Sequence, residues 1–318
     1  MIAHGKLLLH LDCFQSDDCY QRYLEHPAVA GVLIPSQACI DEQQTLSCIK
    51  RIRKYHPRAI VLYSPDSSYQ KWLENGCLTW DQLSKLYTKH PEKGKEQANF
   101  QGKKFALRLK YLGFNASLDI HLNPGHTENI CNNISNDPHT LIGLLRYYIQ
   151  GQIQIGWPII AGLFPTALKK GQTLSYKDRR DLPTIRENDL LPFFHFQRFF
   201  KGLCINNRLY PKIDGKMVSE SSYWINQVIR QDLNYNNAII GHFTLNNKVD
   251  IEDHCMPMLT NSCDLLMLNG NRKHVDTLLN TAIQWETSTY LKRRLAILQG
   301  RYLIRQNMKQ WWDALPIN

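Results

Sequence analysis

Hydrophobic residues in this chain gather in short, nearly continuous runs, and longer amphipathic stretches separate the runs. The runs are Leu7–Leu11, Gly31–Ile34, Ala59–Tyr63, Ala116–Leu122, Ile159–Phe164, Gly202–Ile205, Ala238–Ile240 and Leu265–Leu268. A strand that is covered on both faces has this pattern, because the side chains on either face meet a buried layer. The runs therefore predict a parallel sheet with both faces covered.

The stretches between the runs predict helices. Glu42–Tyr55 places Leu46, Ile49 and Ile52 at helical spacing, and Ser219–Leu233 opens with polar residues before an apolar face. Further helices are predicted at His274–Ile283 and from Thr287 to about Asp313. A strand and a helix that alternate throughout the chain predict a single (β/α)8 barrel of the α/β class over residues 1–285, with residues 286–318 as a C-terminal helical extension packed on it.

Composition narrows the setting of this fold. The chain has 318 residues and nine cysteines, and no two cysteines form a Cys-x-x-Cys pair. We therefore predict free thiols in a reducing cytoplasm. The sequence contains no apolar run long enough to span a membrane, and the first apolar run is too short for a signal peptide.

The net charge of +10 leaves two interpretations open. Clustered Lys and Arg side chains could bind an anionic partner, or they could be the solvated faces of helices. The sequence contains no helix-turn-helix, RNP or zinc-finger pattern that would favour nucleic acid.

Other polar clusters predict no metal site and no cofactor. Asp250–Cys255 is rich in possible ligands but lacks metal-ligand spacing. No Gly-rich phosphate loop is present. His10, Asp12 and His121 lie in or beside strands, and we expect hydrogen-bonded barrel residues there rather than ligands.

Several segments, in the same order along residues 7–279, resemble those of one known family. They are Leu24–Ile34, Leu209–Asp214, Ser221–Leu233 and Ser262–Lys273. The chain is similar in these segments to the bacterial cytoplasmic β-N-acetylglucosaminidases of glycoside hydrolase family 3, which are enzymes of peptidoglycan recycling. The resemblance implies the same barrel fold.

The family's catalytic groups are replaced here. The resemblance places the nucleophile in a Ser-Asp-Asp-Leu motif after the seventh strand and the acid/base His on a loop after the fifth. His242 and Phe243 occupy the two Asp positions, and the two loop motifs after the fifth strand have Leu163 and Ala167 in place of His. The acid/base His itself falls near Arg179, and a guanidinium cannot act as a general acid at neutral pH.

The family's sugar-binding positions are also changed. The Asp after the third strand becomes Ser64, the following Glu becomes Asp66, and the Asp after the fourth strand becomes Asn123. The Arg-Asn pair after the second strand falls near Gln37 and Ala38, and a further Arg falls near Asn133. All these positions lie at the carboxyl ends of strands, where barrels of this type place their active sites.

These replacements predict a catalytically inactive homologue that acts as a binding module. Its ligand would be a protein partner or a glycan that contains N-acetylglucosamine. The alternative is a divergent glycoside hydrolase with a rebuilt site, in which Asp66, His242 and Asp119 would converge in one pocket. A third hypothesis assigns the basic charge to an anionic partner.

Overall fold

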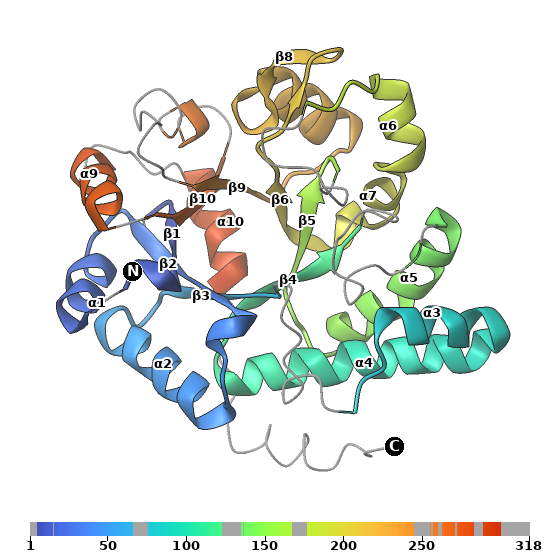
Figure 1. The fold of residues 1–318 in the computed structure, drawn as a ribbon, viewed down its shortest axis with the longest axis horizontal. Coiled ribbons are helices and arrows are strands. Elements are labelled where there is room, and N and C mark those ends of the chain that lie inside the picture. Colours follow the sequence, from blue (N-terminus) through green and yellow to red (C-terminus); the bar gives the residue numbers. More distant parts are fainter. Residues whose placement is uncertain are drawn as a thin grey trace.

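The protein is an eight-stranded parallel barrel surrounded by helices (Figure 1). The computed structural model describes residues 5–14, 16–65, 76–122, 135, 137–166, 177–244, 255, 257–259, 263–270, 272–282 and 289–299. The predicted fold class is confirmed: the strands close in the order β1-β10-β9-β6-β5-β4-β3-β2, and every neighbouring pair is parallel.

Each predicted strand corresponds to one stave of the barrel. The staves are β1 (Leu7–His10), β2 (Val29–Pro35), β3 (Ile60–Ser64), β4 (Ala116–His121), β5 (Ile159–Phe164), β6 (Phe200–Ile205), β9 (Ala238–Thr244) and β10 (Leu265–Asn269). β7 (Leu209–Tyr210) and β8 (Asp214–Met217) form a separate antiparallel hairpin that directly follows β6. This hairpin therefore lies at the end of the barrel where the strands finish.

Helices cover the outside of the barrel. They include α1 (Asp17–Leu24), α2 (Glu42–Tyr55), α3 (Trp80–Lys89), α4 (Pro91–Leu112), α5 (Pro138–Gln154), α6 (Leu182–Asn188), α7 (Leu191–Phe196), α9 (Arg272–Ala282) and α10 (Thr289–Gln299). The predicted helix at Glu42–Tyr55 is confirmed, with Asp41 accepting a hydrogen bond from the Gln44 amide at its start. The helix predicted at Ser219–Leu233 is instead a short 3-10 turn followed by a π-helix, η5 (Tyr223–Asp232).

The strands separate two buried layers. Inside the barrel lies a cluster that draws one or two apolar side chains from each strand, among them Leu8, Leu62 and Ile240. The opposite face of each strand packs against the helices in a second and larger apolar cluster. Both faces are therefore dry along most of each strand, which explains the nearly continuous apolar runs.

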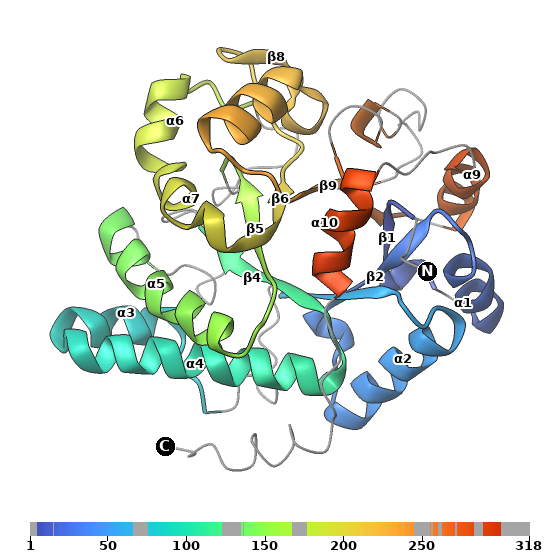
Figure 2. The same cartoon turned by 180° about the vertical axis from the view of Figure 1, so that it is seen from behind.

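Helix α10 closes the end of the barrel where the strands begin. Leu295 and Leu298 are fully buried and pack into the interior cluster. Arg294 donates a hydrogen bond to the Asn236 carbonyl oxygen, and a second one to Asp264 at 2.7 Å. Figure 2 shows α10 in front of the strands when the molecule is seen from behind. Within the described residues, no helix is long and apolar enough to cross a membrane.

Candidate functional site

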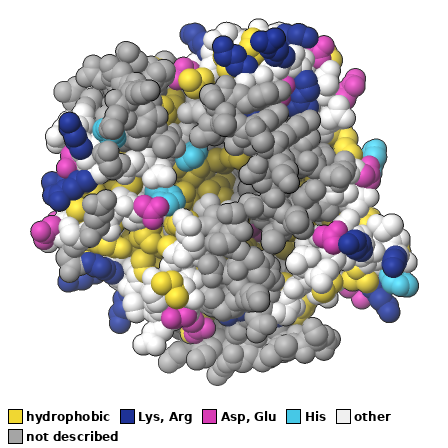
Figure 3. Space-filling model, viewed as in Figure 1, with side chains coloured by type: hydrophobic (Ala, Val, Ile, Leu, Met, Phe, Trp, Pro, Cys, Tyr) yellow, Lys and Arg dark blue, Asp and Glu magenta, His cyan; other side chains and the backbone are white. Residues whose placement is uncertain are grey.

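The alternation of side chains along β9 and β1 aims two histidines into the mouth of the barrel. On β9, Ala238 and Ile240 belong to the interior cluster, so His242, two positions further along, faces the same way. On β1, the same step from Leu8 leads to His10. Figure 3 shows a hollow at the centre of this face, with hydrophobic side chains inside it and histidines beside it.

His242 lies in a site that favours its neutral form. Its imidazole is partly exposed and makes no hydrogen bond or ion pair with any residue that the structure describes. Burial lowers the pKa of His242, and the nearby His10 lowers it further by charge repulsion. The side chain at the first of the two family Asp positions is therefore a neutral imidazole near pH 7.

His10 is held from one side by Asp12. The Nδ1 atom of His10 lies 3.1 Å from Oδ2 of Asp12, whose side chain is 60% exposed at the rim. A protonated Nδ1 donates to this carboxylate, whereas an unprotonated Nδ1 accepts a weak hydrogen bond from the Asp12 amide at 3.4 Å. His10 and Asp12 thus contact each other, in keeping with the expectation of hydrogen-bonded barrel residues.

Phe243, at the second family Asp position, points away from the mouth. It is buried, at 6% exposure, within the outer layer between the strands and the helices. Two successive strand residues project to opposite faces, so His242 and Phe243 cannot both face the interior. Phe243 does not plug the barrel.

Two further candidate residues lie at strand ends near the mouth. Ser64 ends β3, where it follows the inward-facing Leu62 by two residues, so it faces the interior and is partly exposed. Leu163 on β5 packs against the interior cluster and is also partly exposed. The structure therefore gathers Ser64, Leu163 and His242 around one opening, and all three are uncharged near pH 7.

Gln37 and Ala38 lie in the 3-10 turn Ser36–Ala38 that follows β2. Several other candidates fall outside the described residues. Asp66, Asn123 and Ala167 belong to this set, as do Asn133 and the polar run 250–254.

Asp119 does not join His242, which corrects the idea that both converge in one pocket. Asp119 is buried on the helix-facing side of β4, next in sequence to Leu118 of the interior cluster. It accepts hydrogen bonds from Tyr148 Oη at 2.9 Å and from Gln152 Nε2 at 2.7 Å, both on α5. Burial raises the pKa of Asp119 despite these hydrogen bonds. Successive residues of a strand project to opposite faces of the sheet. Leu118 faces the barrel interior, so Asp119 faces the helices.

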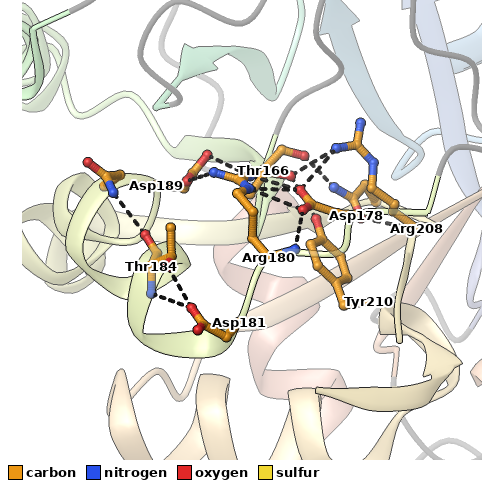
Figure 4. A network of polar contacts seen from close by, with 10 residues as sticks. Thr166, Asp178, Arg180, Asp181, Thr184, Asp189, Arg208 and Tyr210 are labelled. Carbon is orange, nitrogen blue, oxygen red and sulfur yellow. Dashed lines mark hydrogen bonds and ion pairs between the residues drawn. The ribbon is translucent and has the colours of Figure 1, made fainter. Parts of the chain in front are cut away.

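A buried polar network lies beside the mouth, between the end of β5 and the hairpin (Figure 4). Arg180 donates to both carboxylate oxygens of Asp178, with its Nη2 at 2.8 Å from Oδ2, and to Asp189 Oδ2 at 2.7 Å. Arg208 lies 3.8 Å from Asp178 and donates to the hydroxyl of Thr166 at 3.1 Å. Burial alone would raise the pKa of Asp178, but the guanidinium of Arg180 outweighs it, so the pKa lies below its usual range.

Sequence reasoning missed this network. The only signal was the run Asp178-Arg179-Arg180-Asp181, which does not reveal that Arg180 turns inward while Arg179 stays exposed. Arg179, the residue nearest the family's acid/base position, projects into solvent.

The described residues offer no metal centre. Among them, no group of three or more His, Cys, Asp or Glu side chains is arranged to hold a metal ion.

No protein-family model matches the chain. Among sequences, a β-hexosaminidase of Pasteurella multocida is 24% identical over 302 residues, which cover 91% of this chain and 86% of that protein. A β-hexosaminidase of Histophilus somni is 27% identical over 262 residues, covering 77% of this chain and 74% of that protein.

Solved structures share the fold. NagZ from Neisseria gonorrhoeae has a TM-score of 0.85 at 19% identity, covering 99% of this chain and 95% of that one. A glycoside hydrolase family 3 β-N-acetylglucosaminidase from Paenibacillus has a TM-score of 0.73 at 15% identity, covering 98% of this chain and 62% of that one. The chain is thus similar to β-hexosaminidases in sequence and to β-N-acetylglucosaminidases of this family in fold.

Proposed function

We propose that this protein is a catalytically inactive relative of the family 3 β-N-acetylglucosaminidases and acts as a binding module. The observation that carries the proposal is His242, an inward-facing imidazole at the position where the family resemblance expects the nucleophilic Asp.

The chemistry of glycoside hydrolysis explains why this exchange matters. A retaining glycosidase needs a nucleophile that also stabilises an oxocarbenium-like transition state, and a carboxylate does both through its negative charge. The imidazole of His242 is neutral, and protonation would only add a positive charge beside His10. Loss of an essential nucleophile costs roughly 10⁴-fold or more in rate.

The described residues near the family's acid/base positions offer no proton donor either. Arg179, nearest the acid/base position, is exposed, and a guanidinium is not a general acid at neutral pH. Leu163, at a loop His position, packs against apolar side chains. Neither residue can protonate a leaving group.

The sugar contacts favour a protein partner over a glycan. Ser64 stands where the family has a carboxylate that binds sugar hydroxyls, and its hydroxyl offers a weaker, neutral contact. The proposed module therefore keeps the barrel as a scaffold and binds a partner, with cytoplasmic peptidoglycan recycling as its setting.

A hydrolysis assay tests this proposal. We expect the purified protein to release no more aryl leaving group from an aryl β-N-acetylglucosaminide than the His242→Ala variant does. Hydrolysis well above that of His242→Ala would support the alternative, a glycosidase with a rebuilt site.

A further inference from the structure

Four exposed cations lie together at the rim of the barrel mouth. Lys177 and Arg179 precede α6, while Lys212 and Lys216 belong to the β7–β8 hairpin. In Figure 3, basic side chains gather along the edge of the molecule where Figure 1 labels β8. We call these four residues the hairpin patch.

The backbone brings the two halves of the hairpin patch side by side. Lys177 forms a parallel bridge with Leu209 of β7, and the Asp178 amide donates to the Leu209 carbonyl oxygen at 3.0 Å. Lys212 is close enough to Asp181 to lower the pKa of that carboxyl, although hydrogen bonds from Thr184 are the larger cause. Segments 35 residues apart in sequence, from Lys177 to Lys212, thus share one surface.

The buried network beneath the patch holds it in place without neutralising it. Arg180 and Arg208 are balanced by the carboxylates of Asp178 and Asp189. The hydroxyl groups of Tyr210 and Thr166 are 2.7 Å apart and tie the hairpin to the end of β5. Since the interior charges compensate one another, none is left to offset the exposed cations.

Among the described residues, the cations of the patch are not fixed in ion pairs, although Lys212 lies near the carboxylate of Asp181. Within the part of the chain that the structure describes, none of the four side chains forms a hydrogen bond or an ion pair. Besides Asp178, two carboxylates lie in these segments: Asp181, which accepts from Thr184 and lies near Lys212, and Asp214, which accepts from the hydroxyl of Ser221. On α3, by contrast, Lys85 pairs with Asp81 at 2.7 Å.

We propose that the hairpin patch docks an acidic segment of a partner protein. Four cations without ion pairs among the described residues, two on the hairpin and two on the segment bridged to it, match a short run of carboxylates. An ideal Cβ on Gly215, between Lys212 and Lys216, would meet no atom within 4 Å, so the surface there is open. A specific DNA site would need a larger basic surface than four residues provide. The inference rests on the proposed function in one respect: it names the class of partner that the proposed binding module would take.

Fluorescence anisotropy with a labelled octaglutamate peptide tests the inference. At roughly 20 mM salt, where surface charges are weakly screened, we expect the intact chain to bind the peptide. The double variant Lys212→Glu/Lys216→Glu should bind it at least about tenfold more weakly, because two charges are reversed at the contact. The matched control is Lys89→Glu/Lys93→Glu, which reverses two exposed charges on α3 and α4 and should change binding less than about threefold. Equal thermal midpoints would show that both variants fold.

Three results would overturn the inference. They are no peptide binding at low salt, equal losses in the patch and control variants, and tighter binding of a DNA oligonucleotide or phosphatidylserine vesicles through the same lysines. The hydrolysis assay on the same preparation separates the two claims. Hydrolysis of the substrate would contradict the proposed function without affecting the peptide-binding result. Failure to bind the peptide would contradict the docking inference without affecting the hydrolysis result.

Discussion

The two ends of this barrel hold polar side chains in opposite ways. Where the strands begin, Asp264 accepts from Arg230 at 3.2 Å, from Arg294 at 2.7 Å and from the Ile239 amide at 2.8 Å, under the cover of α10. Where the strands end, His242 points toward the barrel interior and makes no hydrogen bond with any described residue. Asp264 is thus held by several donors at the closed end, whereas His242 at the open end has no described hydrogen-bond partner.

The largest expected effect lies at the closed end. Asp264→Ala leaves Arg230 and Arg294 half-buried without their carboxylate and removes the partner of the Ile239 amide. We expect a loss of about 3–5 kcal/mol in the free energy of unfolding, measured by urea denaturation. Asp81→Ala, which breaks an exposed pair, should cost only about 0.3–0.5 kcal/mol. Similar losses in both variants would contradict the contrast between the two ends.

The seal provided by α10 gives the next largest effect. Leu298→Ala removes a fully buried side chain from the interior cluster and should cost about 2–4 kcal/mol in urea denaturation. Its neighbour Ile297 is 42% exposed, so Ile297→Ala should cost much less. If the two variants unfold at the same urea concentration, α10 does not close the barrel.

Asp119, which is buried between β4 and α5, allows a further test of how polar groups are paired. Asp119→Ala removes the carboxylate that accepts from Tyr148 and Gln152. The free energy of unfolding should fall by about 1–3 kcal/mol. Because the folded pKa is raised, the folded state holds the proton longer, so the wild-type protein loses stability as pH rises from about 4 through that pKa. Asp119→Asn should lack this slope in unfolding curves measured across pH. An unchanged slope would mean that Asp119 is ionised when buried.

The smallest effect is expected at the open end. The folded pKa of His242 is lowered, so between that pKa and about 6.5 the unfolded state binds more protons, and stability falls as pH drops through this window. His242→Leu should reduce this slope and change stability little at pH 7. The difference between the two proteins isolates His242 from His26 and His56, whose pKa values are also lowered. A slope that persists in His242→Leu would place the titrating group elsewhere.

The barrel was predictable from sequence because its signal is local. Runs such as Ala238–Ile240 are apolar on both faces only in a covered parallel strand, and each run became a stave. Alternation along β9 and β4 also explains which candidates reach the mouth, since it turns His242 inward and Asp119 outward. The network of Arg180 with Asp178 and Asp189 was not predictable, because the hairpin that completes it lies far along the chain.

Covalent trapping tests most directly whether the mouth of the barrel lacks a catalytic nucleophile. A retaining glycosidase forms a glycosyl-enzyme intermediate, and a fluorinated N-acetylglucosaminyl donor with a good leaving group makes that intermediate accumulate. Intact-protein mass spectrometry after incubation with such a donor should show the unmodified mass of the chain. A stoichiometric glycosyl adduct that maps to His242, or to any other side chain at the barrel mouth, would contradict the account.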